Sequence, residues 1–205
     1  MWGLIENNEI KKIINKPKGL VIGDIQYSRN IFSFRWTNEE RVAIGIYEVV
    51  FDNSNKKDEA YYINTNQSFN FADGVATASF GSATAKELDD IDEVDEAGEP
   101  LLDDNGNQIV TKGLKSQKKD IIKNQASGLL APTDWYVIKA TDVESYSVPS
   151  AVTTFRSDVR TKSNTMETAI DNASDVDALA TLYNYTEQLD GTHTRPLGEF
   201  PTLEV

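Results

Sequence analysis

Few residues of this chain could carry out nucleophilic or general-base catalysis. Its 205 residues include no cysteine and one histidine, His193, so any Ser-His-Asp arrangement would have to use that residue. His193 follows Gly191 in a threonine-rich stretch, where a general base is rarely held rigidly. We therefore expect a solvated histidine, assign no catalytic residue and predict a protein that is not an enzyme.

The acidic residues at 103–107 suggest a cation-binding loop. An EF-hand loop needs oxygen ligands at positions 1, 3 and 5, glycine at position 6 and glutamate at position 12. Counted from Asp103, position 6 is Gln108 and position 12 is Leu114, so the pattern fails. A hairpin turn explains Gly106 better, and we predict no metal site. Paired carboxylates for glycoside hydrolysis remain an open alternative, because so many acids single out no particular pair.

Charge and motifs also limit the partners. The sequence has neither a GxxxxGK[ST] nor a GxGxxG phosphate loop, so we predict no cofactor. A net charge of −13 argues against nucleic acid and anionic membranes, which need a basic surface. No run reaches the roughly 18 apolar residues of a membrane span. The first residues also lack the basic and apolar regions of a signal peptide, so we expect a soluble protein made inside a cell.

Basic and aromatic residues of the C-terminal half are the remaining candidates for binding. Arg156 and Arg160 lie one helical turn apart and could clamp a carboxylate, although exposure to solvent or a role in holding helices together is the simpler expectation. Phe155 precedes them on the same helix. Trp135 is expected to plug the mouth of a helical hairpin, with a binding platform as the second interpretation. A lysine face could bind an acidic partner, but we expect it to be solvated or screened by the chain's own acids: Lys115, Lys118, Lys119 and Lys123.

The C-terminal part, 112–205, must position these side chains, and it reads as a helical hairpin with an extended tail. A first helix begins near Lys112, with Leu114, Ile121, Ile122 and Leu129 pointing inward, and is ended by Gly128 and Pro132. A longer second helix has one apolar face, formed by Val152, Phe155, Val159, Met166 and Ile170. Ser174 or Asp175 caps a third helix. The tail should pack on the body through Leu197 and Phe200.

The N-terminal part, 1–86, reads as a small antiparallel β-domain with one short helix. Hairpin turns are predicted at Asn7-Asn8, Gly23-Asp24 and Asp73-Gly74, and residues 46–51 should pair with 61–64. Thr37 and Glu40 form a capping box, and Gly45 ends that helix. The expected core is Leu4, Ile13, Ile22, Ile25, Phe34, Trp36, Ile44, Tyr47, Val49 and Tyr62.

Residues 87–111 separate these two parts and carry ten acids without a base between them. Such a block repels itself and buries little apolar surface, so we expect a mobile acidic linker. A protruding β-arm should form within it around Asn105-Gly106. No internal repeat is visible. The predicted fold class is therefore α+β, with a small antiparallel β-domain followed by a helical hairpin domain.

One stretch of the sequence resembles a known family. Leu130-Ala131-Pro132-Thr133-Asp134-Trp135-Tyr136, followed by Val148-Pro149, Phe155-Arg156 and Arg160, is similar to the C-terminal helical segment of bacteriophage tail-fibre assembly proteins and tail assembly chaperones. The β-rich beginning is also similar to small phage proteins encoded beside fibre genes. The resemblance covers 129–170 best, while the acidic linker and the full β-domain depart from the short chaperones.

The resemblance implies a non-enzymatic phage tail protein, a structural or adaptor subunit of the virion tail or tail fibre. Its partners would be other tail or fibre proteins, and a second copy of the chain is a further candidate. It would be assembled in the host cytoplasm and located in the virion tail, with partner-binding residues Trp135, Phe155, Arg156 and Arg160. A fibre assembly chaperone that leaves before maturation is the alternative. A tail-borne glycan hydrolase is the more remote one.

Overall fold

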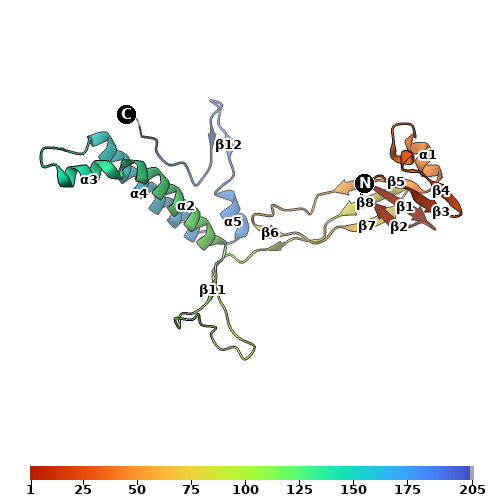
Figure 1. Cartoon of the computed structure of the whole chain (residues 1–205), viewed down its shortest axis with the longest axis horizontal. Coiled ribbons are helices and arrows are strands. Elements are labelled where there is room, and N and C mark those ends of the chain that lie inside the picture. Colours follow the sequence, from red (N-terminus) through yellow and green to blue (C-terminus); the bar gives the residue numbers. More distant parts are fainter. Residues whose placement is uncertain (204–205) are drawn as a thin grey trace. The chain divides into compact units, whose positions relative to one another are not determined.

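The chain consists of two compact units, each with its own fold. The computed structural model describes residues 1–203 and divides the chain between Thr84 and Ala85. The first unit is a β-rich half-barrel and the second is mainly helical, so the predicted mixture of α and β structure is confirmed at this level (Figure 1). The acidic segment 87–111 falls within the second unit.

The main sheet of the first unit has five strands in the order β2-β1-β5-β8-β7. β5 and β8 run parallel, with Val49 opposite Ala76, whereas the other neighbouring strands are antiparallel. The prediction of a purely antiparallel sheet is therefore wrong: the β7–β8 hairpin reverses the chain so that β8 enters beside β5 in the same direction. The strands are β1 (Trp2–Glu6), β2 (Glu9–Ile14), β5 (Ile46–Asp52), β7 (Ser68–Ala72) and β8 (Val75–Ser79).

The predicted pairing of 46–51 with 61–64 is also wrong. Within the sheet, β5 lies between β1, which pairs with residues 46–48, and β8, which pairs with residues 49–52. The short strand β6 (Tyr62–Ile63) pairs instead with β9 (Thr84–Ala85).

The three predicted tight turns are confirmed. β1 and β2 are joined through Asn7 and Asn8, which both have positive φ, and β7 and β8 through Asp73 and Gly74. Gly23-Asp24 joins β3 (Leu20–Ile22) to β4 (Ile25–Tyr27). Asparagine, aspartate and glycine adopt left-handed backbone conformations at low cost, which is why these turns could be read from the sequence.

The single helix of this unit also forms as predicted. A short 3₁₀ helix, η1 (Arg29–Phe32), precedes α1 (Asn38–Ala43). The Glu40 amide donates to Thr37 Oγ1 at 3.2 Å and the Thr37 amide donates to Glu40 Oε2 at 2.8 Å, which completes the capping box. Gly45, with φ of 81°, follows the end of the helix.

The core of the first unit lies on both faces of the sheet. Leu4, Ile14 and Ile46 point toward β3, β4 and η1, whereas Ile13 and Tyr47 point to the opposite side. This follows from the alternation of side chains along a strand. The two buried clusters are Leu4, Ile14, Leu20, Ile31 and Ile46, and Val49, Ala76 and Ala78.

The predicted core was only partly right. Leu4, Val49 and Tyr62 are buried, and five of the other predicted residues are partly buried. Ile25 and Phe34, however, are 58% and 95% exposed. Ile25 sits directly beside the Gly23-Asp24 turn and Phe34 lies in the loop after η1, where buried Ile31 fills the adjacent core instead.

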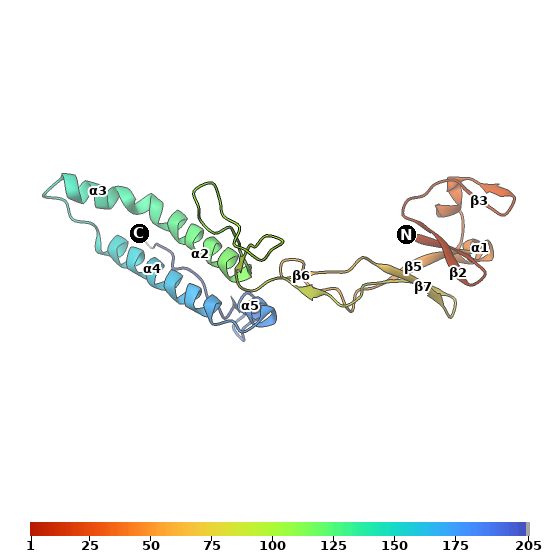
Figure 2. The same ribbon diagram turned by 90° about the horizontal axis from the view of Figure 1, so that it is seen from below.

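The second unit is built on two long helices that lie side by side in both ribbon views (Figures 1 and 2). α2 (Leu114–Leu130) packs against α4 (Ser150–Asp171). The predicted apolar face of α4 is confirmed, because Val152, Phe155, Val159, Met166 and Ile170 are all buried. On α2, Ile122 and Ala126 are buried, whereas Ile121 is exposed, contrary to prediction. Ile121 is adjacent in sequence to Ile122, so its side chain leaves the helix in a different direction from the buried face.

α2 ends at Leu130, just before Pro132, as predicted, but the expected reversal of the chain does not occur there. A single 3₁₀ turn, η2 (Ala131–Thr133), leads directly into α3 (Asp134–Asp142). Pro132 lies at the start of η2, where a missing N–H costs nothing. The chain reverses direction only in residues 143–149, so Trp135 belongs to α3 and not to the mouth of the hairpin.

The last helix and the tail agree with the sequence. α5 (Val176–Thr181) is capped by Asp175, whose Oδ1 accepts from the Ala178 amide at 2.7 Å. Leu197 is buried and Phe200 packs against the α2–α4 core. His193 is exposed on β13 (His193–Thr194), which pairs with β12 (Thr186–Glu187).

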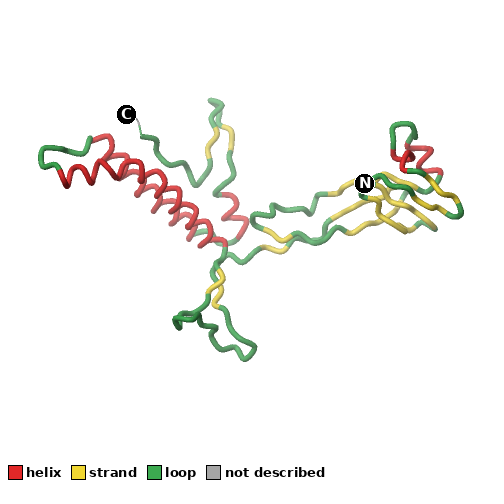
Figure 3. Tube along the Cα trace, in the orientation of Figure 1, coloured by secondary structure: helices red, strands yellow, loops and turns green. Residues whose placement is uncertain are grey.

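The segment 87–111 carries the predicted β-arm, with a hydrogen-bonded base. β10 (Ile91–Asp92) pairs with β11 (Val110–Thr111), and the loops beyond them extend from this ladder (Figure 3). Leu102 pairs with Gln108 across the predicted Asn105-Gly106 turn.

Gly45 provides a test of the first unit. A Cβ there would lie 2.7 Å from the Ile5 carbonyl oxygen, whereas at Gly74, with a nearly equal φ of 77°, it would meet nothing within 4 Å. We expect Gly74→Ala to cost about 1 kcal/mol from backbone strain and Gly45→Ala clearly more, because the clash adds to that strain. Urea unfolding followed by tryptophan emission in a Trp135→Phe background reports this unit alone. Equal losses would contradict the close approach.

Candidate partner-binding surface

Residues 87–90, which we call the acidic strap, fix the start of α2. The helix begins after Gly113, which has no side chain to cap it, and Asp90 takes that role from 23 residues earlier. The Gly113 amide donates to Asp90 Oδ1 and the Ser116 hydroxyl to Asp90 Oδ2, both at 2.9 Å. These two hydrogen bonds hold the pKa of Asp90 below its ordinary value.

The strap lies so close to α2 that only glycine fits at 113. The Leu114 amide donates to the Glu87 carbonyl at 2.9 Å and the Lys115 amide to the Leu88 carbonyl at 3.0 Å. A Cβ on Gly113 would lie 2.2 Å from the Asp89 carbonyl oxygen. The backbone of 87–90 therefore satisfies amides that a helix normally leaves unpaired at its start.

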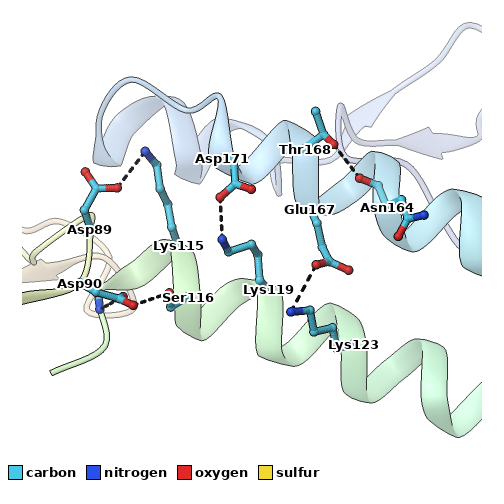
Figure 4. A network of polar contacts seen from close by, with 11 residues as sticks. Asp89, Asp90, Lys115, Ser116, Lys119, Lys123, Asn164, Glu167, Thr168 and Asp171 are labelled. Carbon is cyan, nitrogen blue, oxygen red and sulfur yellow. Dashed lines mark hydrogen bonds and ion pairs between the residues drawn. The ribbon is translucent and has the colours of Figure 1, made fainter. Parts of the chain in front are cut away.

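The predicted lysine face is not an open binding surface, because its members have partners within the unit. Lys119 Nζ lies 2.7 Å from Asp171 and Lys123 Nζ 3.5 Å from Glu167, both on α4, and Lys115 Nζ lies 3.0 Å from Asp89 (Figure 4). Asp171 raises the pKa of Lys119 through a charge-assisted hydrogen bond. Lys118 lies over the Tyr183 ring at 4.9 Å. These contacts connect α2 to the strap, α4 and the segment after α5.

Arg156 holds the two long helices together. Its guanidinium donates to the Leu130 carbonyl at 3.1 Å and to Thr133 Oγ1, and it lies 2.7 Å from Asp134 Oδ1. The side chain is only 12% exposed. With one planar group, Arg156 therefore donates to a carbonyl at the end of α2 and pairs with the carboxylate at the start of α3. This is the stapling role anticipated from the sequence.

The other predicted binding residues divide between interior and surface. Phe155 is buried in a cluster with Ala126 and Val159, so it packs the hairpin and cannot contact a partner directly. Arg160 is exposed and donates to the Arg156 carbonyl at 3.2 Å. It borders two shallow hollows beside α4, together with Arg156 and Asn164.

Trp135 is half exposed, so its predicted role as the plug of the hairpin is wrong. The Arg156 staple and the η2 turn close the helices, and Trp135 lies on the outside of α3. Its ring stacks on Tyr136 with centroids 3.9 Å apart. Lys139 Nζ lies 5.7 Å from the Trp135 ring and 4.3 Å from that of Tyr146. Because the indole is 50% exposed, Trp135→Ala should cost less than the 3–5 kcal/mol of a buried aromatic.

Exposed apolar side chains lie on more than one side of α3, at the end of the helical hairpin that carries Trp135. Three aliphatic side chains of α3 and the following loop are exposed there, Val137, Ile138 and Val143. We call this surface the hairpin tip: Trp135, Val137, Ile138, Lys139, Val143 and Tyr146. Its aliphatic members were not predicted from the sequence, although residues 135–138 are apolar at consecutive positions and so cannot all face one packed side of a helix.

Within residues 1–203, no three His, Cys, Asp or Glu side chains gather in a way that could hold a metal ion. No helix among these residues combines the length and apolar character that crossing a membrane requires. Comparison with protein-family models, curated proteins and solved structures found no match to this chain.

Arg156 and Arg160 form a matched pair for testing the staple. Arg156→Ala leaves the Leu130 carbonyl and Asp134 without their partner and should cost about 2–3 kcal/mol of unfolding free energy in the second unit. Arg160→Ala removes an exposed side chain and should change it by no more than about 0.5 kcal/mol. Urea unfolding followed by Trp135 emission, in a background with Trp2→Phe and Trp36→Phe, measures both, and similar losses in the two variants would contradict the assigned roles.

Asp90 makes the second unit sensitive to acid. Because its pKa is lower in the folded state than in the unfolded chain, Asp90 stabilises the fold above about pH 4, the ordinary range of aspartate, and that stabilisation is lost as the pH falls through the folded-state pKa. Asp90→Asn should therefore flatten the fall in unfolding free energy between about pH 5 and pH 2. Asp158→Asn, at an exposed position of α4, is the control and should leave the profile unchanged. An unaltered profile for Asp90→Asn would contradict the cap.

Proposed function

We propose that this chain is a non-enzymatic bacteriophage tail protein, a structural or adaptor subunit of the virion tail or tail fibre. The observation that carries the proposal is the hairpin tip: an exposed aromatic and aliphatic surface on two helices that are already stapled together. Exposed apolar groups on a rigid support favour binding of another protein, because burying them gains free energy at little cost in ordering.

The composition of the tip supports contact with protein. Tryptophan and tyrosine are common at the energetic centres of protein interfaces. Lys139 lies over two aromatic rings. Its positive charge provides a pairing group for acidic side chains at the edge of the partner's contact surface. The partner in this proposal is another tail or fibre protein, and a second copy of the chain is the other candidate for the same surface.

The sequence resemblance indicates the assembly in which the chain would act, the phage tail. The residues similar to phage tail-fibre assembly proteins and tail assembly chaperones include Trp135, at the tip, and Arg156, at the staple beside it. A subunit that joins tail components would be assembled in the host cytoplasm and carried in the virion tail. Of the predicted partner-binding residues, we now retain Trp135 and Arg160 as direct contacts and assign Phe155 and Arg156 to holding the hairpin.

Mass spectrometry of purified particles from the phage that encodes the chain tests this function. We expect the intact chain at a fixed copy number. Trp135→Ser combined with Ile138→Ser should reduce its incorporation at least about tenfold, because most of the apolar contact is removed. Ile121→Ser, at an exposed aliphatic position of α2 outside the tip, is the matched control and should be incorporated normally.

The alternatives have distinct outcomes in the same experiment. Abundance in lysate before assembly, with absence from particles, would favour a fibre assembly chaperone that binds intermediates and leaves. Release of sugar from host envelope by the purified chain would favour a glycan hydrolase. Normal incorporation of the doubly substituted tip would contradict the tip as the contact surface.

A further inference from the structure

The β-arm contains an internal repeat of eight residues that becomes visible in the structure. Residues 94–101 and 102–109 match in the placement of an aliphatic residue first, an aspartate second, a glycine fifth and an aliphatic residue last. The equivalent pairs are Val94 and Leu102, Asp95 and Asp103, Gly98 and Gly106, and Leu101 and Ile109.

The two repeats form the same turn with equivalent hydrogen bonds. Asp95 Oδ1 accepts from the amides of Ala97 and Glu99 at 2.8 and 3.0 Å. Asp103 Oδ1 likewise accepts from the amides of Asn105 and Asn107 at 2.8 and 2.9 Å. Each turn is also closed by backbone bonds, from the aspartate amide to the sixth residue's carbonyl and from the glycine amide to the aspartate carbonyl. The carboxylates of Asp95 and Asp103 thus build the turns.

Three short ladders meet at the centre of the arm. The Glu93 amide donates to the Ile109 carbonyl, the Leu101 amide to the Glu93 carbonyl and the Ile109 amide to the Leu101 carbonyl, at 2.8–2.9 Å. These bonds form a closed ring among three residues spaced eight apart. The ladders that leave the ring pair Asp92 with Val110, Val94 with Pro100, and Leu102 with Gln108. The arm is therefore a three-way junction with approximate three-fold symmetry.

Because of this symmetry, Val94, Leu102 and Val110 occupy equivalent positions, one residue after each member of the ring. All three are exposed, by 42–55%. The ring residues Leu101 and Ile109, and Ile91 beside them, are exposed by 39–41%. None of residues 91–111 is buried, so the junction has six exposed aliphatic side chains and no core of its own.

A strand assembly of this size without a core is marginally stable in water, so covering one of its faces would stabilise it. Repulsion disfavours covering by the arm of a second copy, because residues 91–111 carry seven acids and no base. The chain's own nearby lysines also have other partners: Lys112 pairs with Asp120, Lys119 with Asp171 and Lys123 with Glu167. Within residues 1–203, no carboxylate of 91–111 forms an ion pair.

We propose that the face formed by Val94, Leu102 and Val110 is a docking site for a different protein, at a segment whose apolar centre is bordered by lysine or arginine. The aliphatic groups meet the apolar centre, and the exposed acidic residues of the same arm, Asp92, Glu96, Glu99 and Asp104, meet the basic border. This inference concerns a surface other than the hairpin tip and does not depend on a location in a phage tail.

The test uses the whole chain and a fluorescently labelled synthetic peptide with a Leu-Ile-Val centre between two pairs of lysines, measured by fluorescence anisotropy. We expect saturable binding that weakens at least about tenfold between low and moderate salt, as for an interface with several charge contacts. Leu102→Ser with Val110→Ser should weaken it about tenfold by removing apolar contact. Glu96→Lys with Asp104→Lys should weaken it at least as much, by reversing the border charge.

Matched controls lie outside the arm. Ile121→Ser replaces an exposed aliphatic residue of α2, and Asp142→Lys with Glu144→Lys reverses two charges at the end of α3 and just after it. Both should leave binding unchanged. Circular dichroism verifies that every variant remains folded.

Four results would overturn the proposal. They are no binding of the peptide, equal binding by all variants, weakening by charge reversal but not by the serine pair, and arm-dependent dimers in sedimentation that are lost with the serine pair. The third would indicate only general attraction between opposite charges. The fourth would make a second copy the occupant.

Discussion

The second unit depends on one carboxylate that crosses from the acidic segment to the start of α2. Asp90 binds the Gly113 amide and the Ser116 hydroxyl, and the backbone of the strap satisfies the next two amides of the helix. A helix that begins at glycine has no cap of its own, so its start is defined by this contact. The same contact joins the base of the arm to the helices, so a segment expected to be a linker is part of the helical unit.

Once the start of α2 is fixed, its charged residues fall opposite those of α4. Lys119 faces Asp171 and Lys123 faces Glu167, a spacing of four residues on each of two antiparallel helices. Arg156 closes the far end through Leu130, Thr133 and Asp134. The basic groups that looked available for a ligand are therefore largely engaged within the unit. Among residues 1–203, the aliphatic groups of the hairpin tip and the β-arm remain exposed, which is why both proposals rest on them.

Local features were predictable from sequence, because a few neighbouring residues determine them. The Asn7-Asn8 and Asp73-Gly74 turns, the Thr37–Glu40 capping box and the Asp175 cap each need only a short stretch with the right backbone preferences or side-chain acceptors. The buried face of α4 was predictable for the same reason, since its period of three and four is a property of one helix. The mixed α and β content followed from these elements.

Contacts between distant residues were not predictable in this way. The parallel pairing of β5 with β8 depends on where a later hairpin enters the sheet, and the residue types around Val49 and Ala76 do not indicate it. Trp135 looked like a core residue by size, but Arg156 and η2 close the hairpin without it. The cap on α2 comes from Asp90, 23 residues before Gly113. The eight-residue repeat was missed because its two copies share residue types at only a few positions, and their equivalence lies in backbone hydrogen bonds.

If the chain works by contact through surfaces that its own fold leaves uncovered, a photo-reactive side chain placed on them should capture a neighbour. The direct measurement introduces a photo-crosslinking amino acid at Ile138, Leu102 or Ile121 in cells that assemble the particle, and compares the adducts formed by the intact chain. Adducts from Ile138 and from Leu102 to other proteins, with none from Ile121, are the predicted result. Equal labelling from all three positions, or adducts from none, would contradict a role for the hairpin tip and the β-arm as binding surfaces.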